Sequence, residues 1–416
     1  MTNACGVDFG TSNSTVGWQQ PGRSALLALE DGKVTLPSVV FFNVEDDAVY
    51  FGRAGLQNYL AGYEGRLMRS LKSLLGTSLI DGQTEVQGRA LPFRMLLAHF
   101  IGELKRRAES AAGRSFEQAV FGRPVHFIDG DPKADRLAQD TLAEVARAVG
   151  FKDIAFQFEP IAAAFDYESQ ISKEELVLIV DIGGGTSDFS LVRLAPERAS
   201  KTERADDILA NDGVHIGGTD FDKYLSLATV MPLLGLGSRL KSQAEVPSSY
   251  YFNLATWHTI NLAYTRKTGI ELKEVYRDAV ERDKLDRLMN LIDDRAGHWL
   301  AIKVEEGKIA LSGAPAVSLE LDRLSPRHTL ALQRTEFDDA IGHLVTRIET
   351  TVTDMLREAG VTPAQVDTVF FTGGSSGVQL LREKIAALVP EAKRVEGDLF
   401  GSIGAGLALD AQRKFA

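Results

Sequence analysis

The sequence predicts a mixed α/β fold built from two related halves, and three observations support this prediction. Short apolar runs rich in β-branched residues alternate with helical patterns of about 12 to 25 residues, which is typical of layered sheets and helices. Two of these runs, residues 176–182 and 366–372, are largely apolar and are followed by glycines, as buried strands of an α/β sheet are. A strand, an Asp and a glycine turn with a Thr occur at residues 6–11 and again at 180–186. The repeat indicates that one structural unit is present twice.

Helix ends are marked most clearly in two places. Asp131 is a good N-cap, Pro132 suits the first helical position, and Gly150 follows as a stop, so a helix is predicted between them. A longer helix is predicted over residues 335–360, where apolar residues recur at helical spacing before a glycine. We also expect one strongly charged helix over residues 272–294.

The composition describes an ordinary globular chain of 416 residues with 44% hydrophobic and 25% charged residues. At about 150 residues per domain, this length predicts two to three domains. Lys and Arg number 46 against 57 Asp and Glu, which gives a net charge of −11. Because this charge repels a phosphate backbone and no basic block offsets it, we expect no nucleic-acid partner.

The single cysteine, Cys5, excludes an intramolecular disulfide and a zinc site built from several cysteines. One cysteine fits a reducing compartment, and the N-terminal residues lack the pattern of a signal peptide, so a cytoplasmic protein is expected. The most apolar stretch, residues 225–240, is shorter than the roughly 20 residues that a membrane-spanning helix needs. We therefore expect no membrane segment.

The repeated Asp-Gly-Thr turns predict a phosphate-binding site. Glycines let backbone N–H groups approach a phosphate chain, the Thr adds a donor, and an Asp at a strand end can hold Mg²⁺ through water. Further glycine turns follow at residues 215–222 and 372–377. None of the four turns fits the dinucleotide-binding or P-loop pattern. The copy at Asp181, DIGGGT, is the more specific one, since such a pattern occurs by chance only about once in a thousand chains of this length.

Taken in order, these motifs resemble the nucleotide-binding part of the DnaK-type heat-shock chaperones, the seventy-kilodalton class, within the actin and sugar-kinase ATPase superfamily. The match covers most of the chain. The segments that carry it are GVDFGTSNS from Gly6, LKSLLG from Leu71, FEPIAAA from Phe158, VDIGGGTSD from Val180, HIGGTDFD from His215, EEGKIALS from Glu305, GGSSG from Gly373, and Asp398 with IGAG from Ile403.

The resemblance implies a duplicated actin-like, ribonuclease H-like ATPase fold with two lobes around a nucleotide cleft. The first lobe is expected at residues 1–175 and the second at 176–416. Within the second lobe, residues of about 221–308 form a longer stretch than the family counterpart. This expanded region is a candidate contact for a protein client or co-chaperone.

The resemblance also implies roles for individual residues, with ATP or ADP and Mg²⁺ as cofactors. Asp8 and Asp181 would orient the hydration shell of Mg²⁺, Lys72 would neutralise charge on the transferred phosphoryl group, and Glu159 and Thr186 would act around the attacking water. The residues implied to be catalytic are Lys72, Glu159, Asp181 and Thr186. The residues implied to contact the nucleotide are Gly10, Thr11, Ser12, Asn13, Gly183, Gly184, Gly185, Thr186, Asp188, Gly217, Gly218, Glu305, Lys308, Ser312, Gly373, Gly374, Ser375 and Asp398.

Simpler interpretations exist for several of these residues. Lys72 could belong to a solvated charged face, and Glu159 could merely favour a helix N-terminus. Glu305 and Lys308 lie one helical turn apart and could form an exposed ion pair. We expect His215 to be structural and Cys5 to be a small core residue.

The chain also departs from the family pattern. Ile309 and Gly377 stand where the family commonly carries arginines that stack on adenine, so weaker binding or altered base choice is expected. Pro124 and Arg136 resemble a relay to the peptide-binding domain, and with the sequence stopping at Ala416 we expect that domain to be missing. In the expanded region, aromatic residues 250–257 are expected to belong mainly to the core.

These observations favour an Mg-dependent protein that binds ATP and hydrolyses it slowly, as a chaperone-like protein lacking the peptide-binding domain. Two alternatives remain open from the sequence. One is a small-molecule kinase of the same superfamily, which needs an acceptor hydroxyl and an Asp base. The other is a nucleotide sensor or actin-like assembly protein that does not catalyse hydrolysis.

Overall fold

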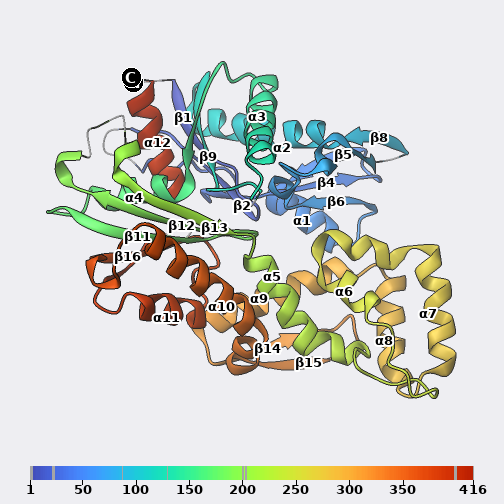
Figure 1. Ribbon diagram of the computed structural model, residues 1–416. Coiled ribbons are helices and arrows are strands. Elements are labelled where there is room, and N and C mark those ends of the chain that lie inside the picture. Colours follow the sequence, from blue (N-terminus) through green and yellow to red (C-terminus); the bar gives the residue numbers. More distant parts are fainter. Residues whose placement is uncertain are drawn as a thin grey trace. The chain divides into compact units, whose positions relative to one another are not determined.

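The computed structural model describes residues 3–20, 24–86, 88–128, 130–198, 201, 204–397 and 401–415. By their internal contacts the residues divide into two compact units (Figure 1). The first comprises Met1–His215, Ile348–Ser376 and Arg382–Ala416. The second comprises Ile216–Arg347 and Gly377–Leu381. The predicted lobe boundary at residue 175 remains a prediction.

The first unit contains a five-stranded sheet in the order β10-β9-β1-β2-β3. β1 pairs antiparallel with β2 and parallel with β9, and Asp8 at the end of β1 lies opposite Thr15. The strands are β1 (Ala4–Asp8), β2 (Asn13–Gly17), β3 (Thr35–Pro37), β9 (Gln118–Arg123) and β10 (Asp153–Phe158).

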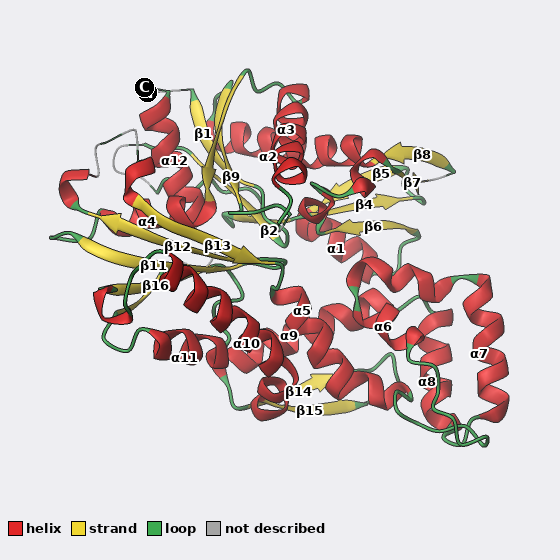
Figure 2. Cartoon of the chain, in the orientation of Figure 1, coloured by secondary structure: helices red, strands yellow, loops and turns green. Residues whose placement is uncertain are grey.

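A second five-stranded sheet of the same unit repeats this topology, in the order β13-β12-β11-β16-β17. In each sheet, the three strands that come first in sequence pair antiparallel with one another. Two later strands then add in parallel on the other side (Figure 2). The strands are β11 (Glu175–Ile182), β12 (Ser187–Leu194), β13 (Ile208–Val214), β16 (Thr368–Thr372) and β17 (Lys393–Glu396). The predicted duplication is therefore present in the fold.

Helices α4 (Glu159–Glu168) and α12 (Ser402–Lys414) pack against each other and against the two sheets. α12 covers β1 and β9, while α4 covers β11 and β12. A side chain at Gly406 would collide with the carbonyl group of Ala162, so this glycine permits the close approach of the two helices. On the first sheet, the apolar faces of α2 (Phe93–Ala112) and α3 (Pro132–Ala148) complete a separate core.

Smaller elements complete the first unit. A three-stranded sheet, β5-β4-β6, and a hairpin, β7-β8, follow the first sheet in sequence. Their bounds are β4 (Val39–Asn43), β5 (Ala48–Phe51), α1 (Gly52–Leu60), β6 (Gly65–Arg69), η1 (Leu71–Leu74), η2 (Ser78–Asp81), β7 (Gln83–Val86) and β8 (Arg89–Pro92). Three short 3-10 turns are η3 (Pro196–Arg198), η4 (Ala205–Asp207) and η8 (Pro363–Gln365). Helix α11 (Gln379–Leu388) begins in the second unit and continues in the first.

The second unit is mainly helical and carries one hairpin, β14-β15. The long helix α10 (Arg334–Glu358) begins in this unit. The other elements are α5 (Gly218–Leu225), η5 (Ser226–Val230), η6 (Met231–Leu234), α6 (Ser249–Ala255), η7 (Trp257–Tyr264), α7 (Arg266–Asp278), α8 (Arg282–Asp293), α9 (Gly297–Gly313), β14 (Ala316–Glu320) and β15 (Thr329–Gln333).

The single charged helix predicted over residues 272–294 is wrong. Helix α7 ends at Asp278, and α8 begins at Arg282. Between them Ala279 is extended and forms a β-bridge with Leu240, while Lys241 N–H donates to the Asp278 carbonyl at 2.7 Å. Pairing with a distant segment has overridden the local helical tendency.

The helices predicted from their ends are confirmed. The Asp131 carboxylate accepts hydrogen bonds from the N–H groups of Lys133 and Ala134 at the start of α3. The predicted stop, Gly150, adopts a φ of 99° just beyond α3. Cys5 is fully buried, as expected of a core residue.

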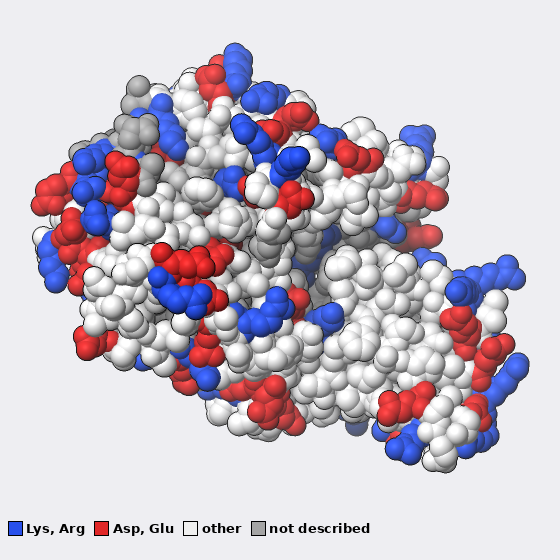
Figure 3. Space-filling model, viewed as in Figure 1, with Lys and Arg blue, Asp and Glu red and all other residues white. Residues whose placement is uncertain are grey.

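Two surface properties bear on partners. On the face drawn in Figure 3, basic and acidic side chains are interspersed. Among the described residues, no helix is both long and apolar enough to cross a membrane.

Candidate functional site

The first predicted phosphate loop follows β1 directly. The turn is so tight that a side chain at Gly10 would collide with the carbonyl of Asn13. Ser38 supports the turn: its Oγ donates to the Gly10 carbonyl at 2.7 Å and its N–H donates to the Ser12 carbonyl at 2.9 Å. Ser38 is fully buried. The loop is therefore held by hydrogen bonds to a core residue that lies 28 positions from Gly10 in the sequence.

The second loop, between β11 and β12, lies against the first. A side chain at Gly184 would collide with Ser12 Oγ, and one at Gly185 would contact the Thr11 side chain at 3.6 Å. Within the second loop, Gly183 N–H donates to the Thr186 carbonyl at 2.9 Å. The structure thus places the two glycine turns face to face, with the hydroxyl groups of one beside the glycines of the other.

Lys72 lies beside these loops on η1, which the chain enters through Ser70 in a left-handed conformation with a φ of 58°. The Lys72 ammonium donates a short hydrogen bond to Glu159 Oε1, at the first turn of α4. Only 8% of Lys72 and 6% of Glu159 are exposed. Lys72 is therefore not part of a solvated face, and Glu159 is more than a helix-terminal charge.

Three further carboxylates, Asp8, Asp181 and Asp188, are buried close enough to Lys72 and Glu159 to interact with their charges. Burial and the charge of Glu159 raise the pKa of Asp8 to about 7, although Lys72 acts in the opposite direction. Burial, followed by the charges of Glu159, Asp188 and Asp8, raises the pKa of Asp181 well above its usual range. Four carboxylates thus face one ammonium, and the group needs further positive charge to ionise fully.

The same carboxylates stabilise the charged form of Lys72. Burial alone would lower its pKa, but the charges of Glu159 and Asp8 and the hydrogen bond to Glu159 raise it above the usual value. Lys72 is therefore a permanent cation within the carboxylate cluster.

Asp181 provides the clearest test of whether a metal ion fits this group. Its Oδ1 atom is buried without a hydrogen-bond partner and lies against Gly373, which has a φ of 81°. Hard oxygen donors in a carboxylate-rich setting suit Mg²⁺, which usually retains several waters. In the described part of the chain, no three His, Cys, Asp or Glu side chains are arranged as direct metal ligands. The buried, unpartnered oxygen of Asp181 fits a cation that approaches with its own waters.

Asp188 is held by two donors. Thr186 Oγ1 donates to its Oδ2 atom at 2.8 Å, and the N–H of Val125 donates to its Oδ1 atom at 3.0 Å. Burial and the charge of Glu159 raise the pKa of Asp188 to about 7, while the bonds from Thr186 and Val125 act to lower it. This carboxylate is therefore fixed in orientation beside the second loop.

The helix that the resemblance assigns to the adenosine side, which carries Glu305, Lys308 and Ser312, lies in the second unit. Lys308 on α9 is buried, donates to the Gly218 carbonyl at 3.0 Å and pairs with Asp222 at 2.9 Å. Its carboxylate partner is Asp222, which excludes the simple exposed pair with Glu305. Ile309, the next residue, is 62% exposed.

The remaining predicted residues fall in three places. Gly217 immediately precedes α5, and its N–H donates to Asp220 Oδ2 at 3.0 Å. Ser312 lies on α9, and a side chain at Gly377 would contact it at 3.8 Å. Gly374 and Ser375 follow β16, where Ser375 N–H donates to the Ile182 carbonyl at 2.9 Å. Asp398 lies outside the described residues.

The structure adds two residues that the motifs did not indicate. Ser38 supports the first loop, and Arg123 contacts the segment that donates to Asp188. Neither belongs to a glycine turn, and their partners are distant or irregularly spaced in sequence. The expected structural role of His215 agrees with its bond from Nε2 to the Phe127 carbonyl, at 2.9 Å.

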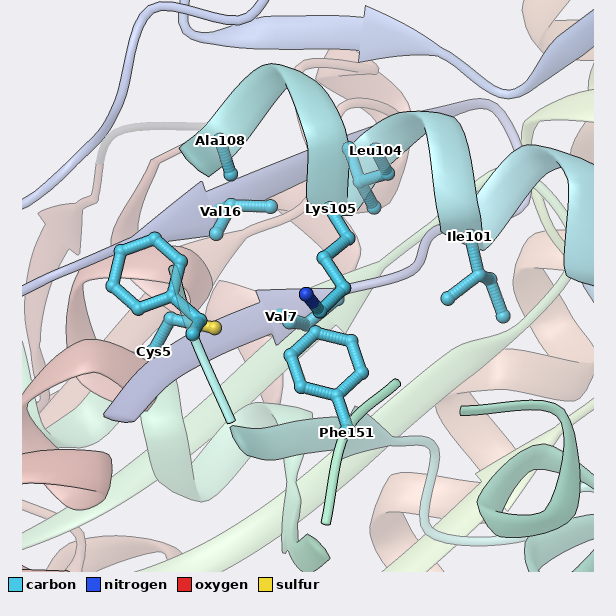
Figure 4. Close-up of a pocket in the computed structure, with 9 residues that line it drawn as sticks. Cys5, Val7, Val16, Ile101, Leu104, Lys105, Ala108 and Phe151 are labelled. Atoms are coloured by element: carbon cyan, nitrogen blue, oxygen red, sulfur yellow. The ribbon is translucent and has the colours of Figure 1, made fainter. Parts of the chain in front are cut away.

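A pocket in the core of the first sheet is separate from this cluster (Figure 4). Its lining includes Cys5 from β1 and Lys105 from α2, with the ring of Phe151 opposite. Burial raises the pKa of the Cys5 thiol. The Lys105 ammonium pairs with Glu109 at 2.5 Å and lies 5.3 Å from the centre of the Phe151 ring.

The fold and the loop geometry can be compared with known families. A family model described as Hsp70 protein matches residues 4–230 and 275–410. The chain belongs to the Hsp70 family. The predicted resemblance and the actin-like ATPase fold are thereby confirmed.

Membership in the Hsp70 family has functional consequences at a coarse level. Hsp70 proteins bind ATP with Mg²⁺, act as ATPases and generally bind client proteins and co-chaperones. The match is interrupted at residues 231–274. These residues lie inside the stretch of about 221–308 that the sequence indicates to be longer than its family counterpart.

Proposed function

We propose that this Hsp70-family protein binds ATP with Mg²⁺ and hydrolyses it slowly to ADP and phosphate, as a chaperone-like ATPase. The observation that carries the proposal is the buried Lys72–Glu159 pair among three Asp carboxylates, beside two glycine turns that face each other. This arrangement supplies N–H and hydroxyl donors for phosphate oxygens together with one fixed cation. Phosphoryl transfer depends on such positioning and charge stabilisation more than on covalent help from the protein.

The two loops would bind the phosphate chain. Thr11, Ser12 and Asn13 would donate from the first loop, and the N–H groups of residues 183–186 from the second. Because Ser38 fixes the first loop from below, its donors are oriented before the nucleotide arrives. Donors that need no rearrangement stabilise developing charge most effectively.

Lys72 would act on the transferred phosphoryl group. In hydrolysis, the oxygen of water bonds to the γ-phosphorus while the bond from that phosphorus to the β–γ bridging oxygen breaks. Negative charge grows on the bridging oxygen and on the phosphoryl oxygens, and Lys72 would neutralise part of it. The Glu159 carboxylate holds the ammonium in place.

The acidic residues would orient water and cation. Asp8 and Asp181 would hold the waters of Mg²⁺, which when bound contributes positive charge at the phosphate oxygens. The Thr186 hydroxyl is bonded to Asp188 and would help to place the attacking water. With raised pKa values, Asp8 and Asp188 are able to hold or release a proton near neutral pH.

Base recognition is proposed to be weaker than in other family members. Ile309 is exposed, and Gly377 offers no side chain beside Ser312. Without the two arginines, no guanidinium from these positions stacks on the base. We therefore expect a small difference in affinity between ATP and GTP.

The expanded region is our proposed contact for a protein partner. Phe252, Leu262 and Ile270 lie within the residues outside the family match and are 46%, 52% and 54% exposed. The aromatic segment is thus divided, since Tyr250 and Tyr251 are buried while Phe252 is not. Replacing Leu262 and Ile270 with Ser should leave hydrolysis unchanged and weaken binding of such a partner.

The proposal is tested by incubating the purified protein with γ-labelled ATP and Mg²⁺ and no other substrate. Release of labelled phosphate that stops when Mg²⁺ is chelated supports a self-contained ATPase. Tight ATP binding without phosphate release contradicts it and favours a sensor. Phosphate transfer only after a small hydroxyl compound is added favours the kinase.

A further inference from the structure

Arg123 ends strand β9, and its guanidinium makes hydrogen bonds in several directions. Nε donates to the Pro124 carbonyl at 3.0 Å, and one terminal nitrogen donates to the Val125 carbonyl at 3.1 Å. That same nitrogen bonds both oxygens of Asp135, at 2.9 and 2.7 Å. The other terminal nitrogen donates to Gln139 Oε1 at 2.7 Å. One side chain thus ties the turn after β9 to helix α3.

Two aromatic rings flank the same guanidinium. Its central carbon lies 5.3 Å from the centre of the Phe127 ring and 5.0 Å from that of Phe158. Phe158 directly precedes Glu159, the partner of Lys72. Arginine suits this position because its planar group can stack and donate several hydrogen bonds at once, which a lysine cannot do.

The segment held by Arg123 reaches the phosphate site. Asp135, itself paired with Arg123, accepts a bond from the N–H of Phe127 at 2.7 Å. Between these anchors, the N–H of Val125 donates to Asp188 Oδ1 at 3.0 Å. Asp188 therefore takes one of its two orienting bonds from a backbone segment whose position Arg123 determines.

Arg136 contrasts with Arg123. It is exposed, and within the described ranges its side chain makes no hydrogen bond or ion pair. The resemblance of Pro124 and Arg136 to a relay remains a prediction. In the structure, Arg123 donates to the carbonyls of Pro124 and Val125.

We propose that Arg123 is a positioning residue for the phosphate site, which acts by holding residues 124–127 so that Val125 N–H orients Asp188. The proposal rests on the ATPase function proposed above. Arg123 itself contacts neither of the two phosphate loops in these bonds. The proposal therefore predicts that its effect on hydrolysis passes through Val125 and Asp188, and not through Phe158 and its neighbour Glu159.

A double-mutant cycle tests this route. Arg123→Gln should lower kcat by about 10- to 100-fold with KM nearly unchanged, since a small misplacement of a catalytic group can cost that much. In an Asp188→Ala background, Arg123→Gln should lower kcat by less than about twofold further, because the group through which it acts is gone. Arg123→Lys should fall between the wild type and Arg123→Gln. Arg136→Gln, the matched control, should change nothing.

Equal losses from Arg123→Gln in both backgrounds would overturn the proposal, because a general structural defect does not depend on Asp188. A kcat unchanged by Arg123→Gln would overturn it as well. Should a double variant fail to fold or be too slow to measure, hydrogen exchange of the Val125 amide decides. Arg123→Gln should speed that exchange about tenfold or more relative to Arg136→Gln, and equal exchange in the two variants contradicts the proposal.

The amide measurement also separates this proposal from the proposed function. If the wild type releases no phosphate from ATP, the ATPase proposal fails and Arg123 has no catalytic effect to exert. Faster exchange in Arg123→Gln would then show only that the segment is held as described, and the catalytic part of the inference would be rejected.

Discussion

Two lysine–glutamate pairs in the same unit, one buried and one partly buried, have different surroundings. Lys72 pairs with Glu159 across 87 residues and shares its environment with three Asp carboxylates. Lys105 pairs with Glu109 one helical turn away and faces an apolar pocket. Both lysines are largely buried. Pairing with a glutamate is therefore common to both lysines, and what distinguishes Lys72 is the excess acidic charge beside two glycine turns.

The two lysines also differ in whether the polar atoms around them have hydrogen-bond partners. Around Lys105, which is partly buried, the ammonium has a carboxylate and an aromatic ring as neighbours. Around Lys72, Asp181 retains a buried oxygen without a partner. An unpartnered buried oxygen is costly, which is the expected cost of a site prepared for a ligand.

The largest effect on hydrolysis is expected from a substitution at Gly373, which lies against Asp181. In Gly373→Ala, the new methyl group would collide with Asp181 Oδ1 and with the backbone of Ile182, so Asp181 must move. Hydrolysis should fall about 100-fold or more, as for other misplaced catalytic groups. The rate of phosphate release measures this effect.

Gly360 provides the matched control for Gly373. It also has a positive φ, of 66°, but no atom lies close to the place that a side chain would occupy. Gly360→Ala should cost about 1–2 kcal/mol of stability through backbone strain alone and leave hydrolysis intact. Equal losses of hydrolysis in the two variants would show that backbone strain, rather than Asp181, explains the effect.

A smaller effect is expected from pH. Without Mg²⁺ the pKa values of Asp8 and Asp188 are raised to about 7. Because Mg²⁺ binds the ionised carboxylates, hydrolysis at subsaturating Mg²⁺ should increase from about pH 6 to pH 8. Phosphate release at constant ionic strength measures the profile. A rate that falls across this range would contradict the assigned ionisation.

Stability without nucleotide should change in the opposite direction. In the unfolded chain Asp has a pKa of about 4, so the folded protein binds the proton more tightly. The resulting stabilisation is complete below about pH 4 and is lost as the pH rises through about 7. In thermal melts, Asp8→Asn should make the loss of stability between about pH 4 and pH 7 smaller. Lys105→Ala should leave that loss unchanged.

The smallest effect is expected at the adenosine side. In Ile309→Arg, the added guanidinium should tighten ADP binding by about 2- to 30-fold, since a cation–π contact contributes about 0.5–2 kcal/mol. Ala310→Arg, at the exposed neighbouring position on α9, should not tighten it. Calorimetric titration with ADP and GDP measures both effects, and equal tightening by the two variants would indicate general electrostatic attraction.

Much of the fold could be predicted from the sequence, because local signals and tertiary structure agree there. Asp131 with Pro132 marked the start of α3, and the two Asp-Gly-Thr turns marked the duplicated sheets. The charged helix could not be predicted correctly, because Ala279 pairs with Leu240. No local pattern reveals such a distant pairing.

The candidate site was predicted less completely. The glycine turns carry their own chemical signal, whereas the pairing of Lys72 with Glu159 could be expected only from resemblance to a family. Ser38 and Arg123 were missed because their importance comes from contacts across the fold. In general, the glycine turns could be predicted from the sequence, and the residues that hold them in place could not.

The two lysines provide the most direct test of the account. Single-turnover hydrolysis of ATP with Mg²⁺ should be compared in the wild type, Lys72→Ala and Lys105→Ala, with ADP affinity measured in parallel. In Lys72→Ala, hydrolysis should fall by at least about 100-fold. ADP should bind within about tenfold of the wild type, since Lys72 is proposed to act on the transferred phosphoryl group, which ADP lacks. Lys105→Ala should be less stable yet hydrolyse ATP within about threefold of the wild type. Unchanged turnover in Lys72→Ala, or equal losses in both variants, would contradict the account.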